Sequence, residues 1–81
     1  MPSKSVTVGS SVGLHARPAS IISEAAEGLG STVTINGVDA SSSLMIMTLG
    51  AKMGDVVEVA GEDESAVDTI AALVERDLDA E

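Results

Sequence analysis

The chain of 81 residues contains no cysteine, phenylalanine, tyrosine or tryptophan. Without cysteine it can form no disulfide, no thiolate metal site and no catalytic thiol. Without aromatic rings its core has to be aliphatic, and enough aliphatic residues are present, since 44% of the sequence is hydrophobic. A domain of about 60–80 residues buries only about 60% of the surface that its unfolded chain exposes. We therefore predict a single folded domain over residues 1–81 with a small aliphatic core.

Long apolar runs are also missing from the sequence. No stretch approaches the roughly 18 apolar residues that a transmembrane helix needs, and the first residues do not follow a signal-peptide pattern. We therefore expect a cytoplasmic monomer that does not insert into membranes.

Basic residues are scarce, and the acidic residues are unevenly placed. The net charge is −9, from 13 Asp and Glu against 4 Lys and Arg. Residues 1–23 hold none of the acids but include Lys4, Arg17 and the single histidine, His15. Such a distribution disfavours nucleic acid as a partner and leaves one end of the chain able to receive an anion.

Hydrophobic periodicity and turn signals predict seven elements in the order β-α-β-β-α-β-α. The expected strands cover residues 4–8, 32–35, 38–41 and 55–60, and the expected helices cover about 16–29, 44–49 and 65–78. Asn36-Gly37 predicts a type I′ hairpin turn, which needs positive φ at both positions. This order favours an α+β open-faced sandwich, an antiparallel sheet with the helices on one face. The residues predicted to face the core are Val33, Ile35, Val38, Ala40, Val57, Val59, Val67, Ile70, Val74 and Leu78.

The segment Gly13-Leu14-His15-Ala16-Arg17-Pro18-Ala19 places the histidine directly before the first predicted helix. The first N–H groups of a helix have no intrahelical partner and carry the positive end of its dipole. Together with the guanidinium of Arg17 they favour binding of an anion such as phosphate. A metal site is disfavoured, because the chain has no second histidine. These residues predict an anion or phosphoryl site, and the alternative is a histidine that only caps the helix.

The segment Gly13-Leu14-His15-Ala16-Arg17-Pro18-Ala19-Ser20 resembles the active-site signature of the HPr family, the histidine-containing phosphocarriers of the bacterial sugar phosphotransferase system. Residues 42–50 resemble the second motif of that family, a serine followed by a short apolar helix ending in Leu-Gly. The resemblance covers essentially the whole chain. It implies a four-stranded antiparallel sheet with three helices on one face.

The resemblance also implies a phosphoryl relay that needs no cofactor. Enzyme I, charged by phosphoenolpyruvate, would phosphorylate His15 at Nδ1, and the chain would hand the group to the A domains of sugar permeases. Arg17 and the backbone amides of Ala16 and Arg17 would stabilise the group during transfer. The chain would then act as a carrier and not as a stand-alone enzyme.

The apolar segment Leu44-Met45-Ile46-Met47 is too short a helix to turn every side chain toward the core. Exposed Leu and Met side chains can form an adaptable docking patch. The resemblance implies that this helix lies beside the histidine. We therefore predict that Leu44 and Met47 contact partner proteins, together with Ala16 and Ser20 around the histidine.

Ser42 corresponds to the serine that a regulatory kinase phosphorylates in many family members, although a helix N-cap is a sufficient reason for a serine here. Ser43 stands where most relatives have an apolar residue, and Glu24 and Glu27 stand where some have lysines. Two alternative functions stay open. One is an HPr-like regulator of nitrogen use or transcription, and the other is an acidic carrier of the acyl-carrier type.

Overall fold

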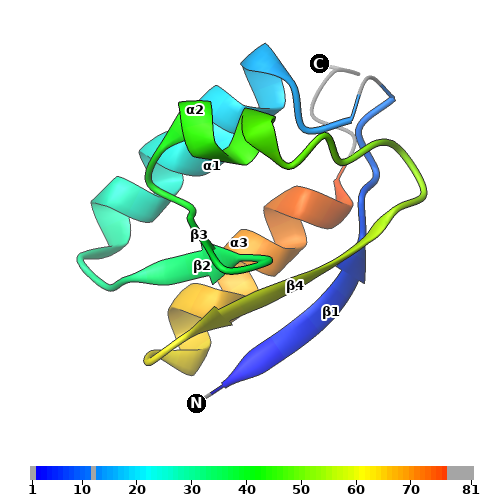
Figure 1. The fold of residues 1–81 in the computed structure, drawn as a ribbon. Coiled ribbons are helices and arrows are strands. Elements are labelled where there is room, and N and C mark those ends of the chain that lie inside the picture. Colours follow the sequence, from blue (N-terminus) through cyan, green and yellow to red (C-terminus); the bar gives the residue numbers. More distant parts are fainter. Residues whose placement is uncertain (1, 12, 77–81) are drawn as a thin grey trace.

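The computed structural model describes residues 2–11 and 13–76, and within them four strands and three helices follow in the predicted order (Figure 1). The strands are β1 (Ser3–Thr7), β2 (Val33–Ile35), β3 (Val38–Asp39) and β4 (Val56–Gly61). The helices are α1 (Ala16–Leu29), α2 (Ser43–Thr48) and α3 (Glu64–Glu75).

The four strands form one antiparallel sheet in the order β1-β4-β2-β3. The central strand β4 places Val57 opposite Val6 of β1 and Val59 opposite Ile35 of β2. These directly opposed side chains point to the same face of the sheet, and all four are buried. The three helices cover that face, as Figure 1 shows, so the predicted open-faced sandwich is confirmed.

The hairpin between β2 and β3 has the predicted turn but a shorter second strand. Asn36 and Gly37 have φ values of 50° and 85°, as a type I′ turn requires. The predicted strand over residues 38–41 is wrong in its length, because β3 ends at Asp39. The carboxylate of Asp39 accepts hydrogen bonds from the backbone N–H of Ser41 (2.9 Å) and from its hydroxyl (2.7 Å). These bonds form a local turn that ends the strand.

The core between the sheet and the helices is aliphatic throughout. Burying one Val or Ile side chain stabilises the fold by about 1.5–3 kcal/mol. The predicted core residues that are buried are Val33, Ile35, Ala40, Val57, Val59, Val67, Ile70 and Val74, and Val38 is half-buried. Helix residues that complete the core include Ala19, Ile22, Ile46 and Ala71.

The last helix is shorter than the periodicity predicts. It ends at Glu75, because Arg76 has an extended backbone with φ −79° and ψ 144°, so the prediction of a helix to residue 78 is wrong. Leu78, which the periodicity places in the core, lies outside the described residues. No helix in the part of the chain that the structure describes has the length and apolar character needed to cross a membrane.

Candidate functional site

The loop between β1 and α1 is held by the backbone of two segments that lie far away in the sequence. The N–H of Gly9 donates to the carbonyl of Val74 at the end of α3 (3.0 Å). The N–H of Leu14 donates to the carbonyl of Ala51 (3.0 Å), and the Leu14 side chain is 2% exposed. The residue before His15 is therefore fixed both by a hydrogen bond and by burial in the core.

Gly13 is needed for this arrangement because the loop approaches another backbone closely. Its φ is +76°, and a Cβ atom there would lie 2.3 Å from the carbonyl oxygen of Ala51 and 2.9 Å from Cα of Lys52. A residue with a Cβ atom cannot fit at such distances, and residues other than glycine rarely adopt this φ. The loop before His15 therefore requires glycine at position 13.

His15 occupies the N-cap position of α1. Its carbonyl accepts the N–H of Ala19 (2.8 Å), whereas its imidazole is exposed and makes no capping hydrogen bond. Within the described residues no backbone partner receives the N–H of Ala16 or Arg17, and Pro18 has no N–H to offer. The first turn of α1 contains no acidic residue. The imidazole and two helix N–H groups are thus available to an external anion.

Arg17 lies in the first turn of α1, and its side chain is exposed. Its guanidinium takes part in no ion pair or side-chain hydrogen bond within residues 2–11 and 13–76. An arginine that is not already paired keeps its fork of N–H donors for a phosphate or carboxylate. The structure therefore places His15 and Arg17 two residues apart at the start of α1, with both side chains exposed.

The residues predicted to contact partners differ in exposure. Ala16 and Ser20 are exposed on α1, and Leu44 on α2 is 68% exposed. Met47 is half-buried and packs against the core. Met45, which the sequence prediction omits, is 43% exposed. Helix α2 lies next to α1, as Figure 1 shows.

Ser42 is the N-cap of α2, and its hydroxyl oxygen accepts the N–H of Met45 (3.3 Å). The alternative interpretation of this serine as a helix cap therefore has direct structural support. Ser43 is the first residue of α2 and is half-buried.

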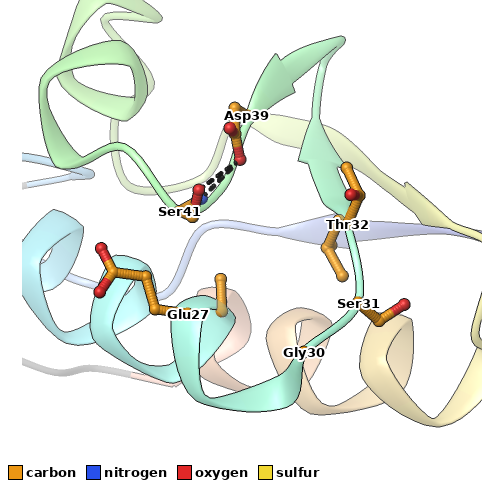
Figure 2. A pocket seen from close by; sticks show the side chains of 8 residues that line it. Glu27, Gly30, Ser31, Thr32, Asp39 and Ser41 are labelled. Carbon is orange, nitrogen blue, oxygen red and sulfur yellow. Dashed lines mark hydrogen bonds between the residues drawn. The ribbon is translucent and has the colours of Figure 1, made fainter.

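A hollow of about 260 Å³ lies at the other end of α1 (Figure 2). It is lined by Ala26, Glu27, Gly30, Ser31, Thr32, Val33, Asp39 and Ser41. A helix of 14 residues is about 21 Å long at 1.5 Å per residue, so the hollow is remote from His15. Its two carboxylates, on Glu27 and Asp39, disfavour an anion. The described residues include no group of three or more potential metal ligands.

The fold and the site together define a class of protein. It is a small open-faced sandwich that presents one histidine, unpaired with any capping group, beside an arginine at the start of a helix. That arrangement suits a protein whose histidine receives an anionic group from another molecule.

Comparison with known proteins specifies the class further. A family model described as the PTS HPr component phosphorylation site matches residues 2–76. The phosphocarrier protein HPr of Streptomyces coelicolor is 39% identical, with the match covering 98% of this chain and 94% of that protein. The chain belongs to the HPr family of phosphocarrier proteins.

Solved structures agree with this assignment. HPr-C-His from Thermoanaerobacter tengcongensis is similar with a TM-score of 0.83 and 30% identity, over 93% of this chain and 92% of that one. A phosphocarrier protein HPr from Bacillus anthracis is similar with a TM-score of 0.83 and 30% identity, over 90% and 95% of the two chains. The resemblance noted at Gly13–Ser20 is thereby confirmed over nearly the full length.

Proposed function

We propose that this chain accepts a phosphoryl group from phosphorylated enzyme I on His15 and passes it to the A domains of sugar permeases. Membership of the HPr family supports a phosphocarrier role in the phosphotransferase system. The observation that carries the assignment to His15 is its position as an exposed N-cap whose imidazole makes no capping hydrogen bond.

In the proposed reaction the lone pair of Nδ1 of His15 attacks the phosphorus atom of the group bound to enzyme I. The new P–N bond forms as the bond to the donor breaks, and the displaced electron pair stays on enzyme I. The transition state is loose, with negative charge spread over the phosphoryl oxygens, so the protein contributes mainly positioning and charge stabilisation. The N–H groups of Ala16 and Arg17 and the guanidinium of Arg17 are the groups that supply it.

The same features support onward transfer. An exposed site with one adjacent guanidinium holds the phosphoryl group without enclosing it, because His15, Ala16 and Arg17 are all exposed. A carrier gains nothing from binding its cargo more tightly than the next acceptor does. A shallow site at a helix start therefore suits reversible transfer between proteins.

The test is incubation with phosphoenolpyruvate and enzyme I, followed by intact-protein mass spectrometry. We expect one added phosphoryl group, labile in acid, that is absent from the His15→Ala variant. Addition of a permease A domain should then remove it. An unmodified wild-type chain, or a modification that persists in His15→Ala, would contradict the proposal.

A second test addresses Arg17. Charge-assisted hydrogen bonds contribute about 1.5–3 kcal/mol, so Arg17→Glu is expected to slow phosphorylation of His15 by about tenfold to a hundredfold. Arg17→Lys keeps the charge without the fork and should be intermediate. Because Arg17 is exposed, both variants should unfold at the wild-type denaturant concentration. Unchanged rates would remove Arg17 from the mechanism.

A further inference from the structure

Lys52 is a second basic residue that the fold brings beside the loop carrying His15. The Cα atom of Lys52 lies 2.9 Å from the point where a Cβ of Gly13 would be. The neighbouring Ala51 accepts the N–H of Leu14 (3.0 Å). Lys52 therefore stands against the backbone just before His15, although it is 37 positions away in the sequence.

These contacts limit how far Lys52 can be from the histidine. A Cβ lies about 1.5 Å from its Cα, so the Cα atoms of Gly13 and Lys52 are separated by at most about 4.4 Å. Two trans peptide units add at most about 7.6 Å, which puts Cα of His15 within about 12 Å of Cα of Lys52. The flexible four-carbon stem of lysine and a phosphorylated imidazole can together span that distance.

The ammonium group of Lys52 is available for such a contact. The side chain is exposed and forms no ion pair or side-chain hydrogen bond within the described part of the chain. A carboxylate oxygen of the neighbouring Asp55 accepts the backbone N–H of Lys52 (2.9 Å) instead of forming an ion pair with the ammonium. The N–H of Asp55 in turn donates to the carbonyl of Lys52 (2.9 Å). The turn is thus held by two bonds to the backbone of Lys52, one from the Asp55 N–H and one to its carboxylate, and neither uses the ammonium.

We propose that Lys52 binds the phosphoryl oxygens on His15 and acts as a second cation opposite Arg17. This inference rests on the proposed function. Arg17 approaches from the first turn of α1, whereas Lys52 approaches from the segment between α2 and β4. A phosphoryl group carries about two negative charges near neutral pH, more than one guanidinium neutralises. A flexible ammonium adds charge stabilisation without a rigid fork, which keeps the group exchangeable.

The test compares Lys52→Gln with Lys4→Gln. Both substitutions remove one positive charge from an exposed side chain. Lys4 lies near the start of β1, and Thr7 is the last residue of that strand, on the side of the loop that carries His15. The three residues from Lys4 to Thr7 correspond to about 10 Å along the strand. At about 0.1 M salt the Debye length is about 10 Å, so this added distance weakens the effect of the Lys4 charge on His15 relative to that of Lys52.

Two phosphoryl donors separate binding of the phosphoryl group from docking of a protein. Phosphorylated enzyme I docks on the chain, whereas phosphoramidate is a small donor with no docking surface. With phosphoramidate the P–N bond of the donor breaks, ammonia leaves, and the new P–N bond forms on His15. We expect Lys52→Gln to slow the reaction about three- to tenfold with both donors, and Lys4→Gln to leave it unchanged.

Two further measurements distinguish a direct contact from a structural effect. Lys52→Arg should restore the rate with phosphoramidate, and the ³¹P resonance of phosphorylated His15 should move in Lys52→Gln but not in Lys4→Gln. Equal unfolding midpoints of Lys52→Gln and the wild type would show that the fold is intact.

Three outcomes would overturn the inference. They are wild-type rates for Lys52→Gln, an equal slowing by Lys4→Gln, and a slowing confined to enzyme I, which would make Lys52 a docking residue. A wild-type chain that enzyme I does not phosphorylate on His15 would instead contradict the proposed function itself, so the two failures are distinguishable.

Discussion

The helices of the described chain begin in two different ways. At the start of α2 the hydroxyl of Ser42 accepts the N–H of Met45 (3.3 Å), and at the start of α3 the carboxylate of Asp63 accepts the N–H of Ser65 (3.0 Å). At the start of α1 the side chain of His15 makes no such bond. Two helices are therefore capped by their own side chains, and one is left open.

The open helix start is fixed by long-range contacts instead. Leu14 is buried and donates its N–H to Ala51, and Gly13 packs against the same backbone segment. The capped starts of α2 and α3 depend on residues two or three positions away. This difference shows how the fold keeps the N–H groups of α1 free for a ligand without losing the position of His15. Gly13 and Leu14, which precede the histidine, hold the start of α1 in place, so the His15 side chain does not have to.

Breaking the long-range anchor should have the largest effect. Gly13→Ala adds the strain of a positive φ, about 1–2 kcal/mol, and also a clash with the backbone of Ala51. We expect it to lower the free energy of unfolding by about 3 kcal/mol or more and to reduce phosphorylation of His15. The measurement is denaturant unfolding together with the mass assay.

The matched control is Gly30→Ala at the other end of α1. Gly30 has φ +69°, but no atom lies within 4 Å of the position that an alanine methyl group would occupy there. Only the φ strain of about 1–2 kcal/mol is expected, with phosphorylation unchanged. Equal losses for the two variants would show that the contact between Gly13 and Ala51 contributes nothing beyond backbone conformation.

Removing the side-chain caps of α2 and α3 should lower the free energy of unfolding by less than Gly13→Ala does and should leave phosphorylation of His15 unchanged. Asp63→Ala and Ser42→Ala should each lower the free energy of unfolding by about 1 kcal/mol. His15→Ala should change it by no more than about 0.5 kcal/mol, because no capping bond is lost. Chemical denaturation of the three variants under one condition checks this order. A loss in His15→Ala as large as that in Asp63→Ala would mean that the imidazole does cap α1.

The substitution His15→Asn tests whether the open start of α1 can be capped as α2 and α3 are. Asn is among the best N-cap residues, so His15→Asn should be more stable than His15→Ala by about 0.5–1 kcal/mol. It should also accept no phosphoryl group, because the nucleophilic nitrogen is absent. Thermal or denaturant unfolding gives the first result and mass spectrometry the second. An N-cap side chain accepts from the second or third helix residue, and Pro18 has no N–H, so a His15→Asn variant no more stable than His15→Ala would mean that the N–H of Arg17 is not accessible to a cap.

The sequence predicts best what is encoded locally. The hairpin at Asn36-Gly37, the alternating burial of Val57 and Val59 and the start of α1 all depend on residue types within a few positions. His15 and Arg17 are predictable in the same way, because they are neighbours in one motif. The predicted end of α3 is wrong, since helical periodicity continues past the residue at which the backbone becomes extended.

What depends on contacts between distant segments is not predictable from the sequence in this way. The approach of Lys52 to Gly13 is set by how the segment after α2 packs against the loop after β1, and no spacing in the sequence encodes that distance. The exposure of Met45 has the same origin. A six-residue helix has no long apolar stripe, so its rotation is fixed by the burial of Ile46. Periodicity over so few residues does not determine which neighbours remain exposed.

The smallest expected effect concerns the locally fixed turn before the capped start of α2. The hydroxyl and the backbone N–H of Ser41 donate to the carboxylate of Asp39, and these bonds hold the pKa of Asp39 below its ordinary value. Since the hydroxyl is the larger cause, Ser41→Ala should raise this pKa part of the way back, and Ser41→Thr should keep it low.

The sign of the accompanying pH effect follows from linkage. A carboxyl group whose pKa is lowered by folding adds stability above its unfolded pKa and loses it as the pH falls through the folded value. Wild type should therefore lose this contribution in acid, and Ser41→Ala should have less of it to lose. An NMR titration of the Asp39 carboxyl in the three proteins checks the order. An unchanged pKa in Ser41→Ala would show that the backbone N–H of Ser41 alone fixes the turn. The turn would then be held by a backbone group, as the loop before His15 is, and not by a side-chain hydroxyl, as the start of α2 is.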